Sequence, residues 1–191
     1  EQIKKIKTAI EEAINVVDLG PSEKKESIEP SHEIHREGFN TREEDFISTH
    51  STPYVEVAFV VPRHYEPHEV SLHVMMDVVQ RIIKAESPIH EQEVVSRVRD
   101  LWGKRRAGSR IDKCVKDAME KVRLSSFCNY SDKCLYMPDQ TIPVRDRSEV
   151  ISTSLRKPEL LPPIELQQAI REVVTASHGA DADGLTTSVA R

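Results

Sequence analysis

Six residues with cationic or hydroxyl side chains crowd one short segment of the 191-residue sequence. They are Lys104, Arg105, Arg106, Ser109, Arg110 and Lys113. Apolar periodicity predicts that a helix starts near Ser109, so these side chains surround its amino end. The helix dipole disfavours cations at this end of a helix, so stability alone does not explain the basic side chains. A phosphate at the same place would be attracted both by the dipole and by the basic side chains. The segment is therefore a candidate site for the backbone phosphates of nucleic acid.

The local charge balance supports an anionic partner for this basic segment. Residues 91–124 contain ten Lys or Arg and six Asp or Glu, an excess of four cations in a chain whose net charge is -5. Lys133, in a predicted turn between two strands, is a further candidate phosphate contact, although single lysines are common in turns. Two alternatives stay open, a basic turn that is merely solvated and a turn that docks a protein.

The cysteines do not form a recognisable metal or disulfide site. Cys114, Cys128 and Cys134 are odd in number and include no CxxC pair, which argues against a disulfide framework and a zinc ribbon. Cys128 and Cys134 face each other if the turn between their strands holds three residues. The ordinary interpretation of these two cysteines is a buried pair of thiols that stays reduced in the cytosol.

The remaining candidates for acid-base or metal chemistry are isolated. His178, Asp181 and Asp183 fall in a predicted turn between two helices, where capping is the ordinary role of such side chains. The sequence contains no interpretable Ser/His/Asp or Cys/His set and no phosphate-binding loop of the Walker A type. We expect no enzyme activity, no metal and no cofactor in this chain.

Composition limits the chain to one small domain with extensions. Hydrophobic residues make up 38%, charged residues 31% and aromatic residues 5%, which suits a modest helical core with much solvated surface. No apolar run approaches about 20 residues and no secretory signal precedes the first helix. We expect a cytoplasmic protein without membrane contact. Because the chain starts at Glu1 and ends inside an amphipathic pattern, we expect both ends to be cut from a longer protein.

Two segments precede the expected domain. Apolar residues at helical spacing predict a helix within residues 1–20, belonging to a preceding domain, which Gly20-Pro21 ends. Residues 21–52 are rich in Glu, Lys, Ser and His and have few apolar side chains. This composition is typical of a linker.

The expected fold is α+β and mainly helical, with a winged helix at residues 53–150. The segment Tyr54–Pro62 is predicted as a strand, since β-branched and aromatic residues stand between two prolines. Apolar periodicity then predicts three helices: one before Ser87-Pro88, one closed by Gly103, and one that begins with a capping box of Ser109 and Asp112. The predicted hairpin has its strands at Ser126–Tyr130 and Lys133–Met137, around Ser131-Asp132. Trp102 and Tyr136 are expected in the core.

A repeat of the apolar pattern predicts a second, truncated winged-helix unit at residues 156–191. A shift of 91 positions places Leu166 on Met75, Ile170 on Val79, Val173 on Ile82, Val174 on Ile83, Leu185 on Val94 and Val189 on Val98. The natural cover of this apolar face would be a third helix and hairpin beyond the sequence. We expect the face to pack on the first unit or to form a homodimer with another copy.

Three segments of the sequence carry a family resemblance. Residues 53–58, 89–98 and above all 102–111 (Trp-Gly-Lys-Arg-Arg-Ala-Gly-Ser-Arg-Ile) resemble an uncharacterised C-terminal domain family. The resemblance spans about residues 53–191. The family occurs at the ends of large bacterial proteins related to superfamily I DNA helicases, often after an endonuclease-like domain. The resemblance thus implies helicase and nuclease domains in the same full-length chain.

The leading functional hypothesis is a non-catalytic accessory domain that binds nucleic acid, with DNA favoured by the resemblance. A protein-docking or interdomain spacer is the main rival, and the acidic net charge would suit it. An enzyme in its own right is the third possibility. Fold alone does not choose among them.

Overall fold

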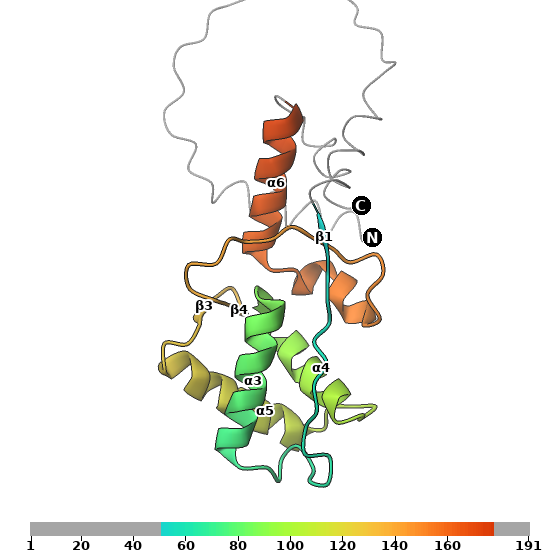
Figure 1. Cartoon of the computed structure of the whole chain (residues 1–191), viewed down its shortest axis with the longest axis vertical. Coiled ribbons are helices and arrows are strands. Elements are labelled where there is room, and N and C mark those ends of the chain that lie inside the picture. Colours follow the sequence, from blue (N-terminus) through green and yellow to red (C-terminus); the bar gives the residue numbers. More distant parts are fainter. Residues whose placement is uncertain (1–50, 178–191) are drawn as a thin grey trace, which may run out of the picture. The chain divides into compact units, whose positions relative to one another are not determined.

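Figure 1 shows the computed structural model of the chain, which describes residues 51–177. The chain divides into two compact units, and one of them, Thr52–Glu165, is called the central unit below. The described residues form four α-helices and two small sheets, which confirms the predicted α+β class. None of the described helices has the length and apolarity needed to cross a membrane. The predicted helix of residues 1–20 and nearly all of the linker 21–52 lie outside the described residues.

Three helices of the central unit bury one shared apolar core. They are α3 (Leu72–Glu86), α4 (Glu91–Leu101) and α5 (Ser109–Leu124). Their aliphatic residues recur every three or four positions, and Met75, Val94 and Val115 have no exposed surface. Burying each such side chain stabilises the fold by about 1.5–3 kcal/mol. The three predicted helices are confirmed, and Trp102 lies in this core as expected.

A small antiparallel sheet lies next to the helices. Its order is β2 (Ile89–His90), β4 (Cys134–Tyr136), β3 (Asn129–Ser131). The predicted hairpin is confirmed, but its turn is Asp132-Lys133, one residue later than predicted. Both turn residues have positive φ, 51° and 61°, as a two-residue hairpin turn requires.

The register of the hairpin corrects the predicted position of the cysteines. Cys134 pairs with Ser131 and Tyr136 with Asn129, so Cys128 does not stand opposite Cys134. The turn holds two residues rather than three, which shifts every pair. Both cysteines are nevertheless buried.

The predicted strand Tyr54–Pro62 is wrong, because only the two residues before it form a strand. β1 (Thr52–Pro53) pairs in parallel with β5 (Arg145–Asp146). The chain then continues as an extended segment without a neighbouring strand (Figure 1). Side chains hold it instead: the N–H of Val57 donates to the carboxylate of Glu86 at 2.8 Å. β-Branched residues favour extended backbone but cannot supply a partner strand.

The end of the described region contains two short 3-10 helices and one long helix. They are η1 (Thr153–Arg156), η2 (Pro158–Leu160) and α6 (Pro163–Ser177). α6 begins and ends 91 positions after α3, as the predicted repeat requires. Ile170 and Val173 are buried. The rest of the predicted second unit, with Leu185 and Val189, lies outside the described residues, so the repeat and the homodimer remain predictions.

Candidate nucleic-acid interface

The basic segment lies where α4 ends and α5 begins. Gly103, with φ 66°, reverses the chain after α4, a conformation that a residue without Cβ adopts readily. The N–H groups of Gly103 and Lys104 each donate at 2.9 Å to carbonyls of the last turn of α4, those of Asp100 and Arg99. These bonds fix the start of the turn. The residues that follow are on the surface.

α5 begins without the predicted capping box. Its N-cap is Gly108, which has no side chain to offer, and Ser109 is the first helical residue. Asp112 pairs with Lys116 at 2.9 Å instead of bonding back to the helix start. An Asp side chain is one methylene shorter than the Glu of the usual box, and Ser109 is one position too late. The first N–H groups of α5 therefore keep no side-chain cap, as an anion site at this end requires.

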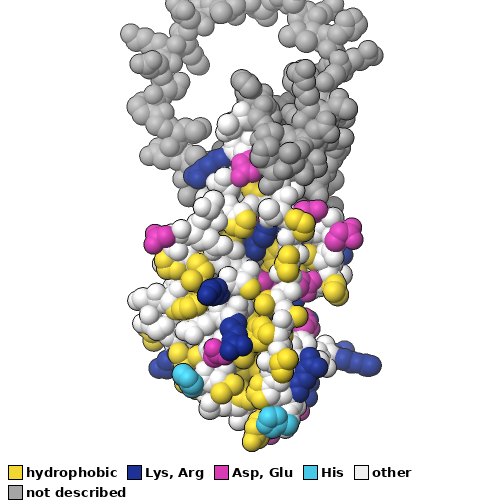
Figure 2. Space-filling view, viewed as in Figure 1, with side chains coloured by type: hydrophobic (Ala, Val, Ile, Leu, Met, Phe, Trp, Pro, Cys, Tyr) yellow, Lys and Arg dark blue, Asp and Glu magenta, His cyan; other side chains and the backbone are white. Residues whose placement is uncertain are grey.

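Three arginines of the segment are exposed and uncompensated. Arg105 and Arg106 lie in the turn and Arg110 in the first turn of α5. Over the described part of the chain, none of the three has an acidic group within ion-pair distance. In Figure 2, Lys and Arg side chains project at the lower right, where Figure 1 draws this turn. These three guanidinium groups are the strongest candidates for phosphate contacts.

The two lysines of the segment are already paired. Lys104 Nζ lies 2.6 Å from Glu66 Oε1, and Lys113 Nζ lies 3.2 Å from Asp117 Oδ2. Both pairs are at least partly exposed, so each is worth little and can open toward a ligand. The two lysines add less uncompensated charge than the sequence implies.

Lys133 does not join the basic segment. Its carbonyl accepts from the N–H of Glu91, the first residue of α4, whereas the basic turn follows the last residue of α4. The 11 residues of α4 span about 16 Å. Lys133 therefore lies at the opposite end of α4 from the turn that carries Lys104, Arg105 and Arg106.

The remaining exposed surface of α5 is largely charge-compensated. Lys116 pairs with Asp112 and Arg123 with Glu120, in addition to the Lys113 pair. The candidate interface is therefore the turn and the first turn of α5 rather than the whole helix.

One further segment belongs to this surface and was not predicted from the sequence. The turn Arg63–Pro67 packs against the end of α4, and the indole N–H of Trp102 donates to the carbonyl of Tyr65 at 3.0 Å. The phenol ring of Tyr65 is exposed. Its aromatic type was the only available signal, because nothing local places residue 65 beside residue 102.

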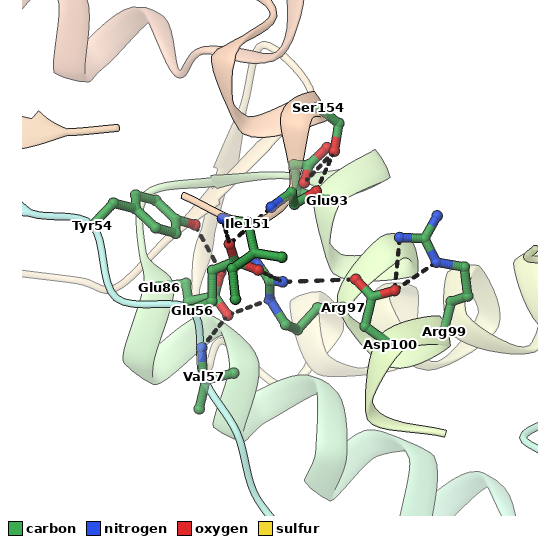
Figure 3. Close-up of polar contacts among 11 residues, drawn as sticks. Tyr54, Glu56, Val57, Glu86, Glu93, Arg97, Arg99, Asp100, Ile151 and Ser154 are labelled. Atoms are coloured by element: carbon green, nitrogen blue, oxygen red, sulfur yellow. Dashed lines mark hydrogen bonds and ion pairs between the residues drawn. The ribbon is translucent and has the colours of Figure 1, made fainter. Parts of the chain in front are cut away.

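A buried ion cluster surrounds Arg97 of α4 (Figure 3). Arg97 is 2% exposed and donates twice to Glu86, at 2.6 and 2.8 Å, and once to Glu56, at 2.5 Å. The hydroxyl of Tyr54 donates to Glu86 at 2.7 Å. The backbone N–H groups of Ile151 and Ser152 donate to Glu56. The cluster thus joins α3, α4, the extended segment and the chain before η1.

The pKa shifts in this cluster follow from its pairing. Burial alone would raise the pKa of Glu56, but the hydrogen bond from the Ser152 backbone and the charge of Arg97 lower it below the usual value. Burial would lower the pKa of Arg97, yet its bonds to Glu86 and the carboxylate charges raise it. Glu56 and Arg97 are therefore held in their charged forms, which marks the cluster as structural.

A second cluster anchors the start of α6. Glu165 accepts from Arg145 and from Arg147, each at 2.7 Å, and Arg145 also donates to the carbonyls of Glu86 and Pro88. Burial would raise the pKa of Glu165, but the hydrogen bonds from Arg147 and Arg145 lower it. Both guanidinium groups lie over the ring of Tyr54, at 4.5 and 4.9 Å.

No described group of three or more His, Cys, Asp or Glu side chains is arranged to hold a metal ion. His178, Asp181 and Asp183 lie outside the described residues, so the prediction about them remains untested.

The fold and the surface together define a small α+β unit with a basic turn, a class of architecture rather than of activity. Residues 65–113 match the family model described as a protein of unknown function, DUF3320. The match covers about a quarter of the chain, from the Tyr65 turn through α3 and α4 to Lys113. It supports the predicted resemblance as far as an uncharacterised domain family. No curated protein and no solved structure matches the chain.

Proposed function

We propose that the central unit is a winged helix that holds nucleic acid through the turn between α4 and α5. The winged-helix proposal rests on element order: α3, β2, α4, α5, β3 and β4 follow one another, and β2 lies beside β4 in the sheet. In helix-turn-helix folds the second helix of the pair approaches nucleic acid. That helix is α5 here.

One observation carries the functional proposal. Arg105, Arg106 and Arg110 are exposed, lack ion-pair partners within the described residues, and surround a helix start whose N–H groups have no side-chain cap. Such a surface attracts phosphates by charge and by backbone donors together. Both attractions act on the sequence-independent phosphate backbone, so we expect weak binding with little sequence preference.

A binding titration at two salt concentrations tests this proposal. The chain is titrated against fluorescently labelled duplex and single-stranded DNA, and anisotropy is measured at about 50 and 200 mM salt. The triple variant Arg105→Ala, Arg106→Ala, Arg110→Ala should weaken binding. It should also reduce the slope of log affinity against log salt, by up to about 0.9 for each duplex phosphate that the variant no longer binds.

A charge-matched triple variant controls for net charge. Lys84, Arg156 and Lys157 are exposed cations outside the proposed surface, and their replacement by Ala changes the total charge equally. Both variants should bind DNA alike only if non-specific charge is responsible. Unchanged affinity in the arginine variant would refute the proposed surface.

The alternative function, a protein-docking or spacer module, has an observation in its favour. Winged-helix proteins that read a duplex use the helix that corresponds to α5. In this protein three ion pairs neutralise most of the exposed basic side chains of α5 that follow its first turn. If the arginine variant binds DNA as well as the wild type, docking becomes the better account.

From the resemblance we further propose that this unit is a non-catalytic accessory domain of a cytoplasmic bacterial protein with helicase and nuclease domains in the same chain. Those domains would supply the chemistry and this one a hold on the substrate. Accordingly, the purified chain should hydrolyse neither ATP nor DNA. Turnover that a point substitution in this chain abolishes would contradict the assignment.

A further inference from the structure

The turn Arg63–Pro67 and the basic turn after α4 form one composite surface. Arg63 Nε donates to the carbonyl of Leu101 at 2.9 Å. Trp102 Nε1 donates to the carbonyl of Tyr65 at 3.0 Å, and Lys104 pairs with Glu66 at 2.6 Å. The thiol of Cys114 in α5 contacts the carbonyl of Pro67 at 3.6 Å. Four contacts over five residues therefore fix this turn against the end of α4, the start of the basic turn and α5.

These contacts leave the Tyr65 ring unused. The bond to Trp102 uses the backbone carbonyl, and the phenol hydroxyl makes no hydrogen bond to any described residue. The side chain is 53% exposed, and within residues 51–177 its ring contacts only that of the adjacent His64, at 4.3 Å and a tilt of 50°. Figure 2 shows hydrophobic, histidine and basic side chains gathered at this lower end of the molecule. One ring face of Tyr65 can therefore receive a planar group.

The exposed tyrosine of the hairpin is different. Tyr130 is 38% exposed, its hydroxyl donates to Glu91 at 2.8 Å, and the guanidinium of Arg123 lies 4.8 Å from its ring centre. A cation already covers that ring. Tyr65 has no such cover among the described residues, and the next residue, Glu66, pairs with Lys104, which precedes Arg105.

The distances allow one strand to touch both groups. Arg105 follows Trp102 by three residues, so their Cα atoms are at most about 11 Å apart. Trp102 in turn holds the Tyr65 carbonyl at hydrogen-bond distance. An arginine side chain can thus reach a phosphate next to a base that stacks on Tyr65.

We infer that this composite surface binds an unpaired nucleic-acid strand, with a base stacked on Tyr65 and the neighbouring phosphates held by Arg105, Arg106 and Arg110. The inference rests on the proposed function and narrows its substrate class. Bases inside a duplex have both faces covered by their neighbours, so an exposed tyrosine gains a stacking partner only from an unpaired base. Stacking of this kind tolerates any base, which agrees with the weak sequence preference proposed above.

Substitution of the ring tests the inference. Anisotropy titrations of the full 191-residue chain use a labelled 20-nucleotide oligo(dT) and a 20-base-pair duplex. Tyr65→Ala should weaken oligo(dT) binding by roughly five-fold or more and leave duplex binding unchanged. Tyr65→Phe keeps the ring and should bind as the wild type does. A parallel titration with oligo(U) determines whether the bound strand is DNA or RNA.

Tyr130→Ala is the matched control, because it removes an exposed tyrosine near the opposite end of α4. It should leave oligo(dT) affinity unchanged. An equal loss in Tyr130→Ala, or an equal loss of duplex and oligo(dT) binding in Tyr65→Ala, would overturn the stacking role. If Tyr65→Ala has no effect while the triple arginine variant still loses affinity, the inference fails and the proposed function stands. If neither variant affects binding, both fail.

Discussion

α4 and the turn after it use arginine in opposite ways. Arg97, within the helix, is 2% exposed and bonded to Glu86 and Glu56. Arg105 and Arg106, a few residues later, are exposed and have no acidic partner within the described residues. An arginine side chain thus forms buried ion pairs that stabilise the fold in one place, and carries an unpaired, exposed charge in the other.

The difference separates what stabilises the fold from what can bind a ligand. A guanidinium whose donors are all engaged by buried carboxylates cannot attract a phosphate, and removing it leaves those carboxylates without compensation. An exposed guanidinium contributes almost nothing to folding but retains its field toward solvent. Substitutions in the two regions should therefore affect different measurements.

Arg97→Ala should give the largest effect on stability. It leaves Glu86 buried without its bidentate partner, and breaking such a pair from one side costs about 3–5 kcal/mol of unfolding free energy. Urea unfolding followed by the fluorescence of Trp102, the single tryptophan, measures this cost.

Arg105→Ala is the paired control for that experiment. An exposed side chain without partners should change the unfolding free energy by no more than about 0.5 kcal/mol. If Arg97→Ala lowers the unfolding free energy by less than about 1 kcal/mol, the buried ion cluster does not stabilise the fold as described above.

The contrast also explains what the sequence could and could not predict. The bounds of α3, α4 and α5 follow from aliphatic spacing, which is local information. Glu86 and Arg97 stand on the same buried stripes, four residues after Ile82 and three after Val94. A charged residue on an apolar stripe was the available signal for the buried cluster, but its partner Glu56 lies 41 residues from Arg97.

The candidate surface was predictable only in its local part. Consecutive basic residues identified the turn after α4, whereas the packing of Tyr65 against it depends on tertiary contacts over 37 residues. The hairpin turn was misplaced by one residue because Lys133 takes a positive φ, which the sequence gives little reason to expect of a lysine. The strand at Tyr54–Pro62 failed for a related reason, since β propensity carries no information about a partner strand.

The next largest effect should be a loss of stability in acid, caused by protonation of the buried, arginine-paired carboxylates. The pKa values of Glu56 and Glu165 are lowered in the fold by their hydrogen bonds and arginine partners. The pKa of a Glu carboxyl in the unfolded chain is about 4.3. When folding lowers this pKa, the carboxylate stabilises the fold fully at pH values above about 4.3, and this stabilisation is lost as the pH falls through the lower pKa of the folded state. Unfolding free energy measured in urea should therefore decline as pH falls from about 4.5 toward 3.

Glu165→Gln should flatten this acid branch and also cost stability at neutral pH, because two arginines lose their carboxylate. Glu149→Gln, an exposed position without an ion pair among the described residues, should leave the branch as it is in the wild type. Identical acid branches in the wild type and Glu165→Gln would contradict the role of this carboxylate.

A smaller effect should distinguish paired from unpaired cations on the exposed side. Arg110→Ala removes an uncompensated charge and should weaken oligo(dT) binding by a few-fold. Lys113→Ala removes a charge that Asp117 already balances, so its effect should be smaller. Both variants should unfold at the wild-type urea concentration. Equal decreases in affinity would mean that the surface ion pair opens freely and does not reduce phosphate attraction.

The smallest predicted effect concerns Glu93, a buried carboxyl beside the Arg97 cluster. Its Oε2 accepts from Ser154 at 3.1 Å, while Oε1 has no hydrogen-bond partner among the described residues. Burial raises the pKa of this group, so its charged form is disfavoured in the fold and its contribution to stability improves as pH falls.

Gln has the same shape without the charge and can keep an acceptor for Ser154. Glu93→Gln should therefore raise the unfolding free energy at neutral pH by about 0.5 kcal/mol or less, and the gain should shrink as pH falls, because the fold favours the protonated form of wild-type Glu93. Urea unfolding of both proteins at about pH 7 and about pH 5 measures the difference. A decrease in stability at neutral pH comparable to that of Arg97→Ala would instead place Glu93 among the groups whose charge the buried cluster requires.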